Sequence, residues 1–448
     1  MTEWRGGAPW FKAPFMRILR REFASVTRFD DSVPAAPIAA PNAACQLYVH
    51  VPFCESLCPF CSFQRVRYRE DKARVYFEML RREIRLYRDR GFIFGDVYVG
   101  GGTPTVSPRE LGETLRLIRA CWPIHTLSVE TNPNHLRPDV LDALQSAGLD
   151  RLSVGVQSFD DALLRAMKRH EPYGGGAQIA ARLAAVRGRF PTLNVDMIFN
   201  FAQQSLESLE RDLAIVRDLD VDQVSFYPLM TSRSTARPME KNLGIADPGR
   251  AFEYYGRILE RLRPAYEPSS AWCFSRAASR PGPRSIDEYV TQQDEYVGVG
   301  SGAFSYVGGR LYATTFSLNR YRERIAAGES GITDCKVLTL KQRMRYDFLV
   351  RLFGLSLPYA FIAAKYGRSF WWRMAPELAA MRLIGATRFD SDAIRLTERG
   401  MYCWMVMMTE FFTAVNTFRD EMRLRIRAEG QRPAGADLGP AARGAGMT

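Results

Sequence analysis

The chain has 448 residues, 46% of them hydrophobic, which is enough for two or three domains with a large buried core. It has no uninterrupted apolar stretch of eighteen residues and no charged segment followed by an apolar one at its start, so we expect a soluble, cytoplasmic protein. The formal net charge of +12 fits an anionic partner and leaves contact with a membrane surface open. The basic residues are spread along the chain without a nucleic-acid-binding module, so we expect no nucleic-acid partner.

Two kinds of sequence follow one another in the first half of the chain. Residues 1–45 show no clear period and are rich in Pro and Ala toward their end, which predicts an N-terminal arm or linker. Short β-rich runs then alternate with amphipathic stretches. The runs predict strands at 46–51, 95–101, 125–132, 151–157, 194–199 and 223–229, and the stretches predict helices at 71–88, 108–120, 138–147 and 206–219. This alternation predicts an α/β fold, a full or partial (β/α)6 TIM-like barrel with its chemistry at the carboxyl ends of the strands.

The second half is less regular. The pattern breaks down after Leu229, then recovers in a helix near 248–263 and a Gly-rich strand pair within 295–315. We expect the barrel with its accessory strands to cover 46–325, and a smaller, mainly helical C-terminal domain to cover 335–429. The Gly-, Ala- and Pro-rich residues 430–448 are predicted to be disordered.

Three of the eight cysteines are crowded into the run YVHVPFCESLCPFCSF, directly after the first predicted strand: Cys54, Cys58 and Cys61. A zinc site would need four ligands, usually in two separated pairs, and no second pair has a suitable spacing. Three thiolates on one loop instead suit a [4Fe–4S] cluster with one iron left open. S-adenosylmethionine (SAM) can bind such an iron through its amine and carboxylate. An electron from the cluster then breaks the sulfonium bond and yields a 5′-deoxyadenosyl radical.

The remaining candidate site residues lie at the ends of later strands. Gly100, Gly101 and Gly102 end the second strand, and their lack of side chains predicts a close cradle for the ammonium group of SAM. Polar residues end three further strands, where they could bind the ribose and the amino-acid part of SAM, although each alone is also typical of a helix cap or a solvated rim. They are Glu130, Gln157 and Asp196. Arg169, one helix after Gln157, could pair with the SAM carboxylate.

The runs YVHVPFCESLCPFCSF, GGGTPT, SVETNP, LSVGVQSFDD and NVDMIF together resemble the oxygen-independent coproporphyrinogen III oxidase family of radical SAM proteins, over roughly residues 46–320. The resemblance implies a SAM site and an electron donor such as flavodoxin or ferredoxin. For His50 beside the cluster, a structural role is equally expected. With Phe60, the aromatic neighbour of the cluster, the implied cofactor-binding residues are Tyr48, Gly101, Gly102, Thr103, Glu130, Gln157, Arg169 and Asp196.

Several positions depart from that family. In the oxidases the cluster loop looks like CxxxCxxCxC, whereas this chain has Phe63 at the position of the fourth cysteine. Their GAHS segment corresponds here to residues 302–305, where Phe304 replaces the histidine. These departures favour a branch that uses two SAM molecules for methyl or methylene transfer or cyclopropanation. We expect it to act on an unsaturated carbon of a hydrophobic or tetrapyrrole-like substrate. The alternatives are oxidative decarboxylation of the coproporphyrinogen oxidase type and a haem-binding chaperone of the same family.

Overall fold

The computed structural model describes residues 44–430 except 231, 245, 246, 248 and 278–293, together with Phe29, Ile38 and Ala40. The predicted N-terminal arm and disordered tail therefore lie almost wholly outside the described residues.

Six parallel strands form the centre of the sheet and follow one another in chain order, as predicted. They are β1 (Cys45–Val51), β4 (Phe94–Gly101), β5 (Thr126–Thr131), β6 (Arg151–Gln157), β7 (Thr192–Phe199) and β8 (Gln223–Pro228). Val49 lies opposite Val99, which lies opposite Val129, and all three are fully buried. Such strands are apolar on both faces because helices or loops cover both sides of a parallel sheet.

Further strands extend both edges of this sheet. At one edge β11 (Tyr296–Val299) pairs in parallel with β1, and three antiparallel strands continue from it: β12 (Phe304–Val307), β13 (Arg310–Thr314) and β14 (Ile332–Val337). At the other edge lie β10 (Cys273–Arg276) and β9 (Tyr266–Pro268). The resulting twelve-stranded sheet is open, because its edge strands β14 and β9 do not pair with each other. The fold is therefore α/β with a partial, open barrel.

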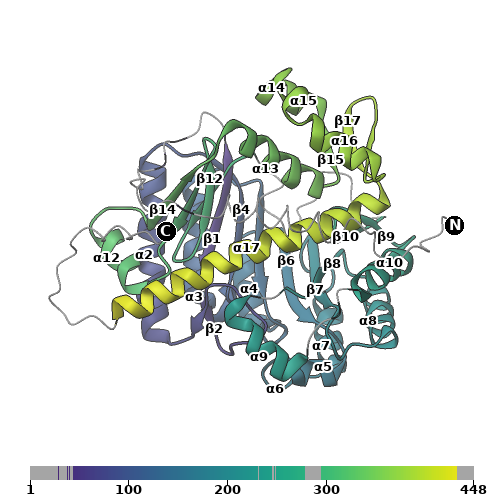
Figure 1. Ribbon diagram of the computed structural model, residues 1–448. Helices are drawn as coiled ribbons and strands as arrows, with labels where there is room; N and C mark the ends of the chain where they lie inside the picture. The colour runs from purple at the N-terminus through teal and green to yellow at the C-terminus, as the bar shows by residue number, and fades with distance from the viewer. Residues whose placement is uncertain are drawn as a thin grey trace, which may run out of the picture.

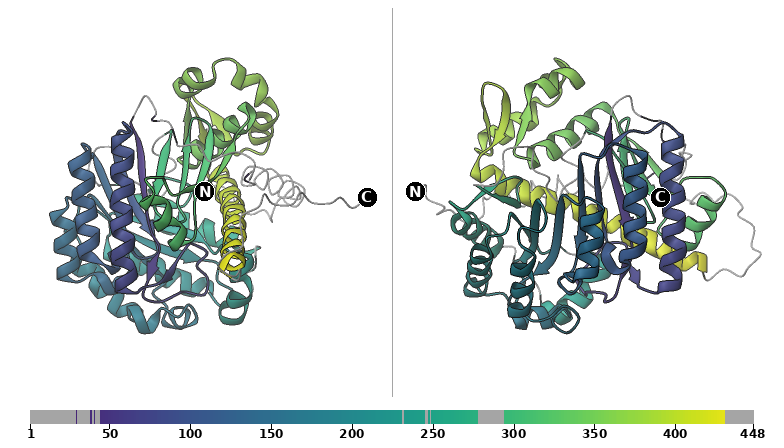
Figure 2. Two further views of the ribbon diagram at one scale, coloured as in Figure 1. Left: turned by 90° about the vertical axis from the view of Figure 1, so that its left-hand side faces the viewer. Right: turned by 180° about the vertical axis from the view of Figure 1, so that it is seen from behind.

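The predicted helices between the strands are present, with ends shifted by no more than one residue. They are α2 (Glu70–Asp89), α3 (Pro108–Cys121), α4 (Pro138–Ser146) and α8 (Leu206–Leu219). Figure 2 shows α2, α3 and α4 side by side on one face of the sheet. Between β6 and β7 lie three short helices that the sequence pattern did not predict: α5 (Asp161–Ala166), α6 (His170–Tyr173) and α7 (Gly176–Val186). The single turns η1 (Pro104–Val106) and η2 (Pro133–His135) were not predicted either.

The segment after Leu229, predicted to be irregular, instead contains the helix α9 (Arg233–Leu243). Ser232 caps it, because its hydroxyl accepts a hydrogen bond from the backbone N–H of Thr235 (3.2 Å). The polar composition of the segment and Pro238 within it hid the helix from a search for apolar periodicity. The helix expected near 248–263 is α10 (Arg250–Leu262).

The C-terminal region is mainly helical, as predicted, with a small three-stranded sheet in addition. Its elements are α13 (Leu340–Phe353), β15 (Ser356–Pro358), α14 (Tyr359–Tyr366), α15 (Ser369–Arg373), α16 (Ala375–Leu383), β16 (Thr387–Phe389), β17 (Ala393–Leu396) and α17 (Glu398–Gly430), whereas α12 (Leu318–Ala326) lies between β13 and β14. The long helix α17 crosses the sheet on the face opposite α2, α3 and α4 (Figures 1 and 2). None of the described helices has the length and apolar character needed to cross a membrane.

A buried carboxyl group holds the turn that follows β6. Asp212 of α8 accepts hydrogen bonds from the Ser158 hydroxyl and the Phe159 N–H, both at 2.8 Å. Burial raises the pKa of Asp212 to about 7, compared with about 3.9 in an unfolded chain. Between these two values the folded protein holds a proton that the unfolded chain has lost. Its free energy of unfolding must therefore fall as the pH rises from about 4 to about 7, and then level off.

We expect the wild-type protein to lose on the order of 2 kcal/mol of unfolding free energy between pH 5 and pH 8 through Asp212. Asp212→Asn keeps one acceptor and one donor for the same turn but cannot ionise. Urea unfolding at several pH values should show a flatter profile for this variant than for wild type. An equally steep fall in both proteins would contradict the assignment.

Candidate functional site

The three clustered cysteines lie on the cysteine loop, residues 54–65, which leaves the sheet at the carboxyl end of β1. A short pairing of β2 (Phe53–Cys54) with β3 (Val66–Arg67) closes the loop. Cys54 and Cys58 are buried and Cys61 is half-buried. Burial, with smaller contributions from the charges of Cys61 and Cys58, raises the pKa of the Cys54 thiol to about 12.

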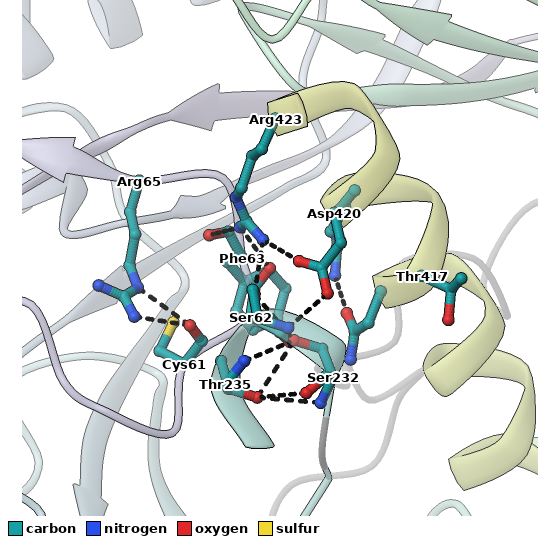
Figure 3. Close-up of polar contacts among 12 residues, drawn as sticks. Cys61, Ser62, Phe63, Arg65, Ser232, Thr235, Thr417, Asp420 and Arg423 are labelled. Atoms are coloured by element: carbon teal, nitrogen blue, oxygen red, sulfur yellow. Dashed lines mark hydrogen bonds and ion pairs between the residues drawn. The ribbon is translucent and has the colours of Figure 1, made fainter. Parts of the chain in front are cut away.

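Two arginines surround this loop. Arg65 donates to the backbone carbonyl of Cys61 at 2.6 Å, as Figure 3 shows, and to that of Cys58 at the same distance. Arg169 is buried, and its Nη1 donates to the Sγ of Cys58 at 3.3 Å. A guanidinium beside the sulfur offsets the negative charge that thiolate ligands bring into a buried site. Three thiols with cationic neighbours fit the donor set of an iron–sulfur cluster.

A single metal ion would need a different arrangement. Among the described residues, no three His, Cys, Asp or Glu side chains form a group that could hold one ion. In a cluster each cysteine binds a different iron, so the thiols need not converge on one point.

The glycines at the end of β4 lie against the cysteine loop. A Cβ atom on Gly102 would lie 2.6 Å from the carbonyl oxygen of Phe53, and one on Gly101 would lie 2.6 Å from the ring of His50. Gly101 also has a φ of +113°, which side-chain-bearing residues rarely adopt. The segment therefore needs glycine here because β1 and the loop pack directly on its backbone.

Glu130 at the end of β5 fixes this glycine segment from the other side. Its carboxylate accepts hydrogen bonds from the Tyr98 hydroxyl (2.8 Å) and from the Gly101 N–H (3.0 Å). The Tyr98 ring stacks on Tyr48, with 6.2 Å between ring centroids. The structure thus brings together three of the predicted residues, Tyr48, Gly101 and Glu130, and Glu130 orders the glycine segment.

His50 has a structural role in this site. Its Nε2 lies 2.9 Å from the carbonyl oxygen of Gln64 and its Nδ1 lies 2.9 Å from the Tyr48 hydroxyl. Burial lowers the pKa of His50 to about 4, so the ring is neutral at pH 7. Because a carbonyl can only accept, Nε2 carries the proton and Tyr48 donates to Nδ1. His50 therefore ties β1 to the end of the cysteine loop.

Asn132 was not predicted, yet it connects two predicted residues. Its amide donates to the Thr103 hydroxyl (2.7 Å) and accepts from Arg169 (2.9 Å). Thr103 in turn donates to the Sγ of Cys54 at 3.6 Å. The signal for Asn132 was present in SVETNP, two residues after Glu130, but a single asparagine after a strand is also common in turns.

Two of the remaining predicted residues, Asp196 and Gln157, lie on the neighbouring strands β7 and β6. The Asp196 carboxylate accepts hydrogen bonds from the Ser153 hydroxyl (2.9 Å) and the Asn194 amide (2.8 Å). In the pairing of β6 with β7, Asp196 lies opposite Gly155. The carbonyl of Gly155 accepts a hydrogen bond from Arg169. Gln157 is half-buried at the end of β6 with a φ of +77°. Phe60 of the cysteine loop is partly buried against the core.

The chain is similar in sequence to known proteins over most of its length. Residues 48–228 match the radical SAM superfamily. Oxygen-independent coproporphyrinogen III oxidase from Salmonella typhimurium is 27% identical over 400 residues, covering 83% of this chain and 86% of that protein. The heme chaperone HemW from Bacillus subtilis is 26% identical over 370 residues, covering 79% and 95%. Anaerobilin synthase from Escherichia coli O157:H7 is 25% identical over 371 residues, covering 80% and 81%.

The fold has a counterpart among solved structures. Coproporphyrinogen III oxidase (HemN) from Escherichia coli superimposes with a TM-score of 0.67 at 22% identity, covering 88% of this chain and 92% of that one. The similarity therefore extends beyond the six parallel strands into the C-terminal helical region.

Proposed function

We propose that this chain, whose residues 48–228 match the radical SAM superfamily and which is similar over most of its length to oxygen-independent coproporphyrinogen III oxidases and HemW, uses SAM to start radical chemistry on a tetrapyrrole. The [4Fe–4S] cluster and SAM are the cofactors of this superfamily. The choice of substrate class rests on one observation. Similarity to the oxidases covers 83% of this chain, well beyond the matched superfamily residues 48–228. If the two proteins shared only the domain that cleaves SAM, we would expect the similarity to end near residue 228.

In this proposal the cluster, when bound, supplies the electron that splits SAM into methionine and a 5′-deoxyadenosyl radical, which takes a hydrogen atom from the substrate. The side chains of Cys54, Cys58 and Cys61 hold the cluster. Glu130 and the backbone at Gly101 bind and orient SAM at the end of β4 and β5. Asp196 and Gln157 contact the rest of SAM from the next strands, with Arg169 between them and the cysteines.

For the reaction we propose oxidative decarboxylation of a porphyrinogen: the radical takes one hydrogen atom from a propionate side chain, carbon dioxide leaves to form a vinyl group, and the remaining electron passes to a one-electron acceptor. This replaces the methyl transfer favoured by the sequence analysis, which the comparisons do not support. Two of the departures behind that preference, Phe63 and Phe304, lie against one residue. The guanidinium of Arg419 lies 4.7 Å from the Phe63 ring centroid and 5.7 Å from that of Phe304. The two departures thus form one packing cluster and are not independent signs of another chemistry.

A haem-binding chaperone is the second candidate. The match to HemW spans 95% of that protein, compared with 86% for the oxidase. This chain also has Phe63 at the position of the fourth cysteine in the CxxxCxxCxC pattern of the oxidases. A carrier would bind haem without consuming SAM.

An anaerobic assay of the reconstituted protein with SAM, dithionite and coproporphyrinogen III tests the proposal. Mass spectrometry should detect 5′-deoxyadenosine, together with a porphyrinogen that has lost carbon dioxide and two hydrogen atoms at a propionate. Stoichiometric haem binding without 5′-deoxyadenosine would favour the chaperone instead. S-adenosylhomocysteine formed together with a methylated product would restore methyl transfer. A fully loaded cluster that cleaves no SAM would contradict an enzymatic role on this substrate.

A further inference from the structure

The C-terminal helix α17 is anchored at both of its ends to the barrel. Near its start, Glu398 pairs with Arg263, which directly follows α10. Near its other end, Asp420 and Arg423 reach the cysteine loop and α9, as Figure 3 shows. The helix therefore connects opposite parts of the sheet across the face on which it lies (Figure 1).

Arg423 contacts the cysteine loop directly after its last cysteine. Its Nη2 donates to the backbone carbonyls of Ser62 and Phe63, both at 2.7 Å. From within the loop, Arg65 donates to the carbonyls of Cys58 and Cys61. Two guanidinium groups thus hold four carbonyls of one short segment. Only one of them, Arg423, comes from a distant part of the chain, 361 positions from Ser62.

Arg423 is itself held in place by Asp420. The Asp420 carboxylate accepts from Arg423 Nη1 at 2.6 Å and from the Ser234 N–H at the start of α9 at 2.9 Å. Asp420 is buried, so this ion pair is less screened by solvent than a surface pair. One turn earlier on α17, Arg419 lies over the Phe63 ring. The loop, α9 and α17 therefore meet at one polar junction.

We propose that Arg423 is a positioning residue that fixes the cysteine loop from the C-terminal helix, so that cluster retention and cluster potential depend on the docking of α17. This inference rests on the proposed function only in requiring that the loop binds a cluster. The loop has little other regular structure, since β2 and β3 are two residues each. Without the guanidinium, two carbonyls lose a charge-assisted donor and the segment beside Cys61 opens more often. The positive charge also stabilises the reduced, more negative cluster.

The test compares three variants of the reconstituted, full-length protein. Arg423→Gln removes the charge and the forked donor, whereas Arg423→Lys keeps the charge but cannot bridge two carbonyls in the same way. Leu424→Ala is the matched control, because Leu424 is the next residue of the same helix and is 62% exposed. The readouts are the rate of cluster loss to a ferrous-iron chelator and the cluster midpoint potential, both measured without SAM or substrate.

We expect Arg423→Gln to lose its cluster about tenfold faster than wild type, equivalent to about 1.4 kcal/mol, and to have a lower midpoint potential. Arg423→Lys should keep a potential near that of wild type while its retention recovers only in part. Leu424→Ala should match wild type in both.

Retention and potential unchanged in Arg423→Gln would overturn the inference. If that variant does not fold, unchanged retention in Arg423→Lys would overturn it equally. A wild-type protein that takes up no cluster would instead contradict the proposed function.

Discussion

Replacing Cys58 by Ala will give a folded protein that no longer assembles a stable cluster and makes no 5′-deoxyadenosine above background. The Sγ of Cys58 is buried and accepts a hydrogen bond from Arg169, so no solvent ligand can easily take its place. Removing one of three thiolates leaves two irons without a protein ligand. Iron and sulfide content, the visible absorbance and 5′-deoxyadenosine formation should all fall together. We expect activity to drop by at least about a hundredfold, or about 2.7 kcal/mol of barrier.

The control for this variant is Cys121→Ala. Cys121 is half-buried at the end of α3, outside the cysteine loop. The Cys121→Ala protein should keep its full iron content, because the substitution removes only the packing contacts of one thiol outside the loop. We expect it to lose roughly 1 kcal/mol of unfolding free energy. A Cys58→Ala protein with normal iron content and activity would contradict the cluster assignment, as would a Cys121→Ala protein that cannot bind iron.

Replacing Glu130 by Gln should weaken SAM binding while leaving the cluster spectrum intact. The carboxylate accepts from Tyr98 and from the Gly101 N–H, and it is only half-buried, so it can also face a ligand. An amide loses the charge and one acceptor. Hydrogen bonds to charged groups contribute about 1.5–3 kcal/mol, so the dissociation constant should rise roughly ten- to a hundredfold. Equilibrium dialysis of the reconstituted protein with labelled SAM measures the change.

Glu210→Gln is the matched control for this prediction. Glu210 lies on α8, away from the strand ends, and pairs with Arg257 and Arg261. Its loss should leave SAM affinity unchanged. SAM affinity unchanged in Glu130→Gln as well would show that Glu130 only orders the glycine segment.

The sequence predicted an element or a site residue correctly wherever the pattern that identifies it lies within one short segment. The six parallel strands were placed to within two residues because each is a short apolar run. The helices α5 to α7 were missed, since the glycines at 174–176 and the short lengths of α5 and α6 hide their periodicity. The same limit applies to the site. The crowded cysteines and the glycine triplet stand out in the sequence, whereas Arg423 is one of 61 basic residues until the fold brings it to the loop.

The anchoring of α17 also sets an order of events during biosynthesis. The ribosome makes the cysteine loop early, but Arg423 emerges 361 positions after Ser62. Until then the carbonyls of Ser62 and Phe63 lack this donor, so we expect the loop to reach its final conformation only after α17 has been made. Iron delivered to a nascent chain would meet an incomplete binding segment. Maturation factors should therefore act on the finished polypeptide, and chains truncated before α17 should remain poor recipients even though all three cysteines are present.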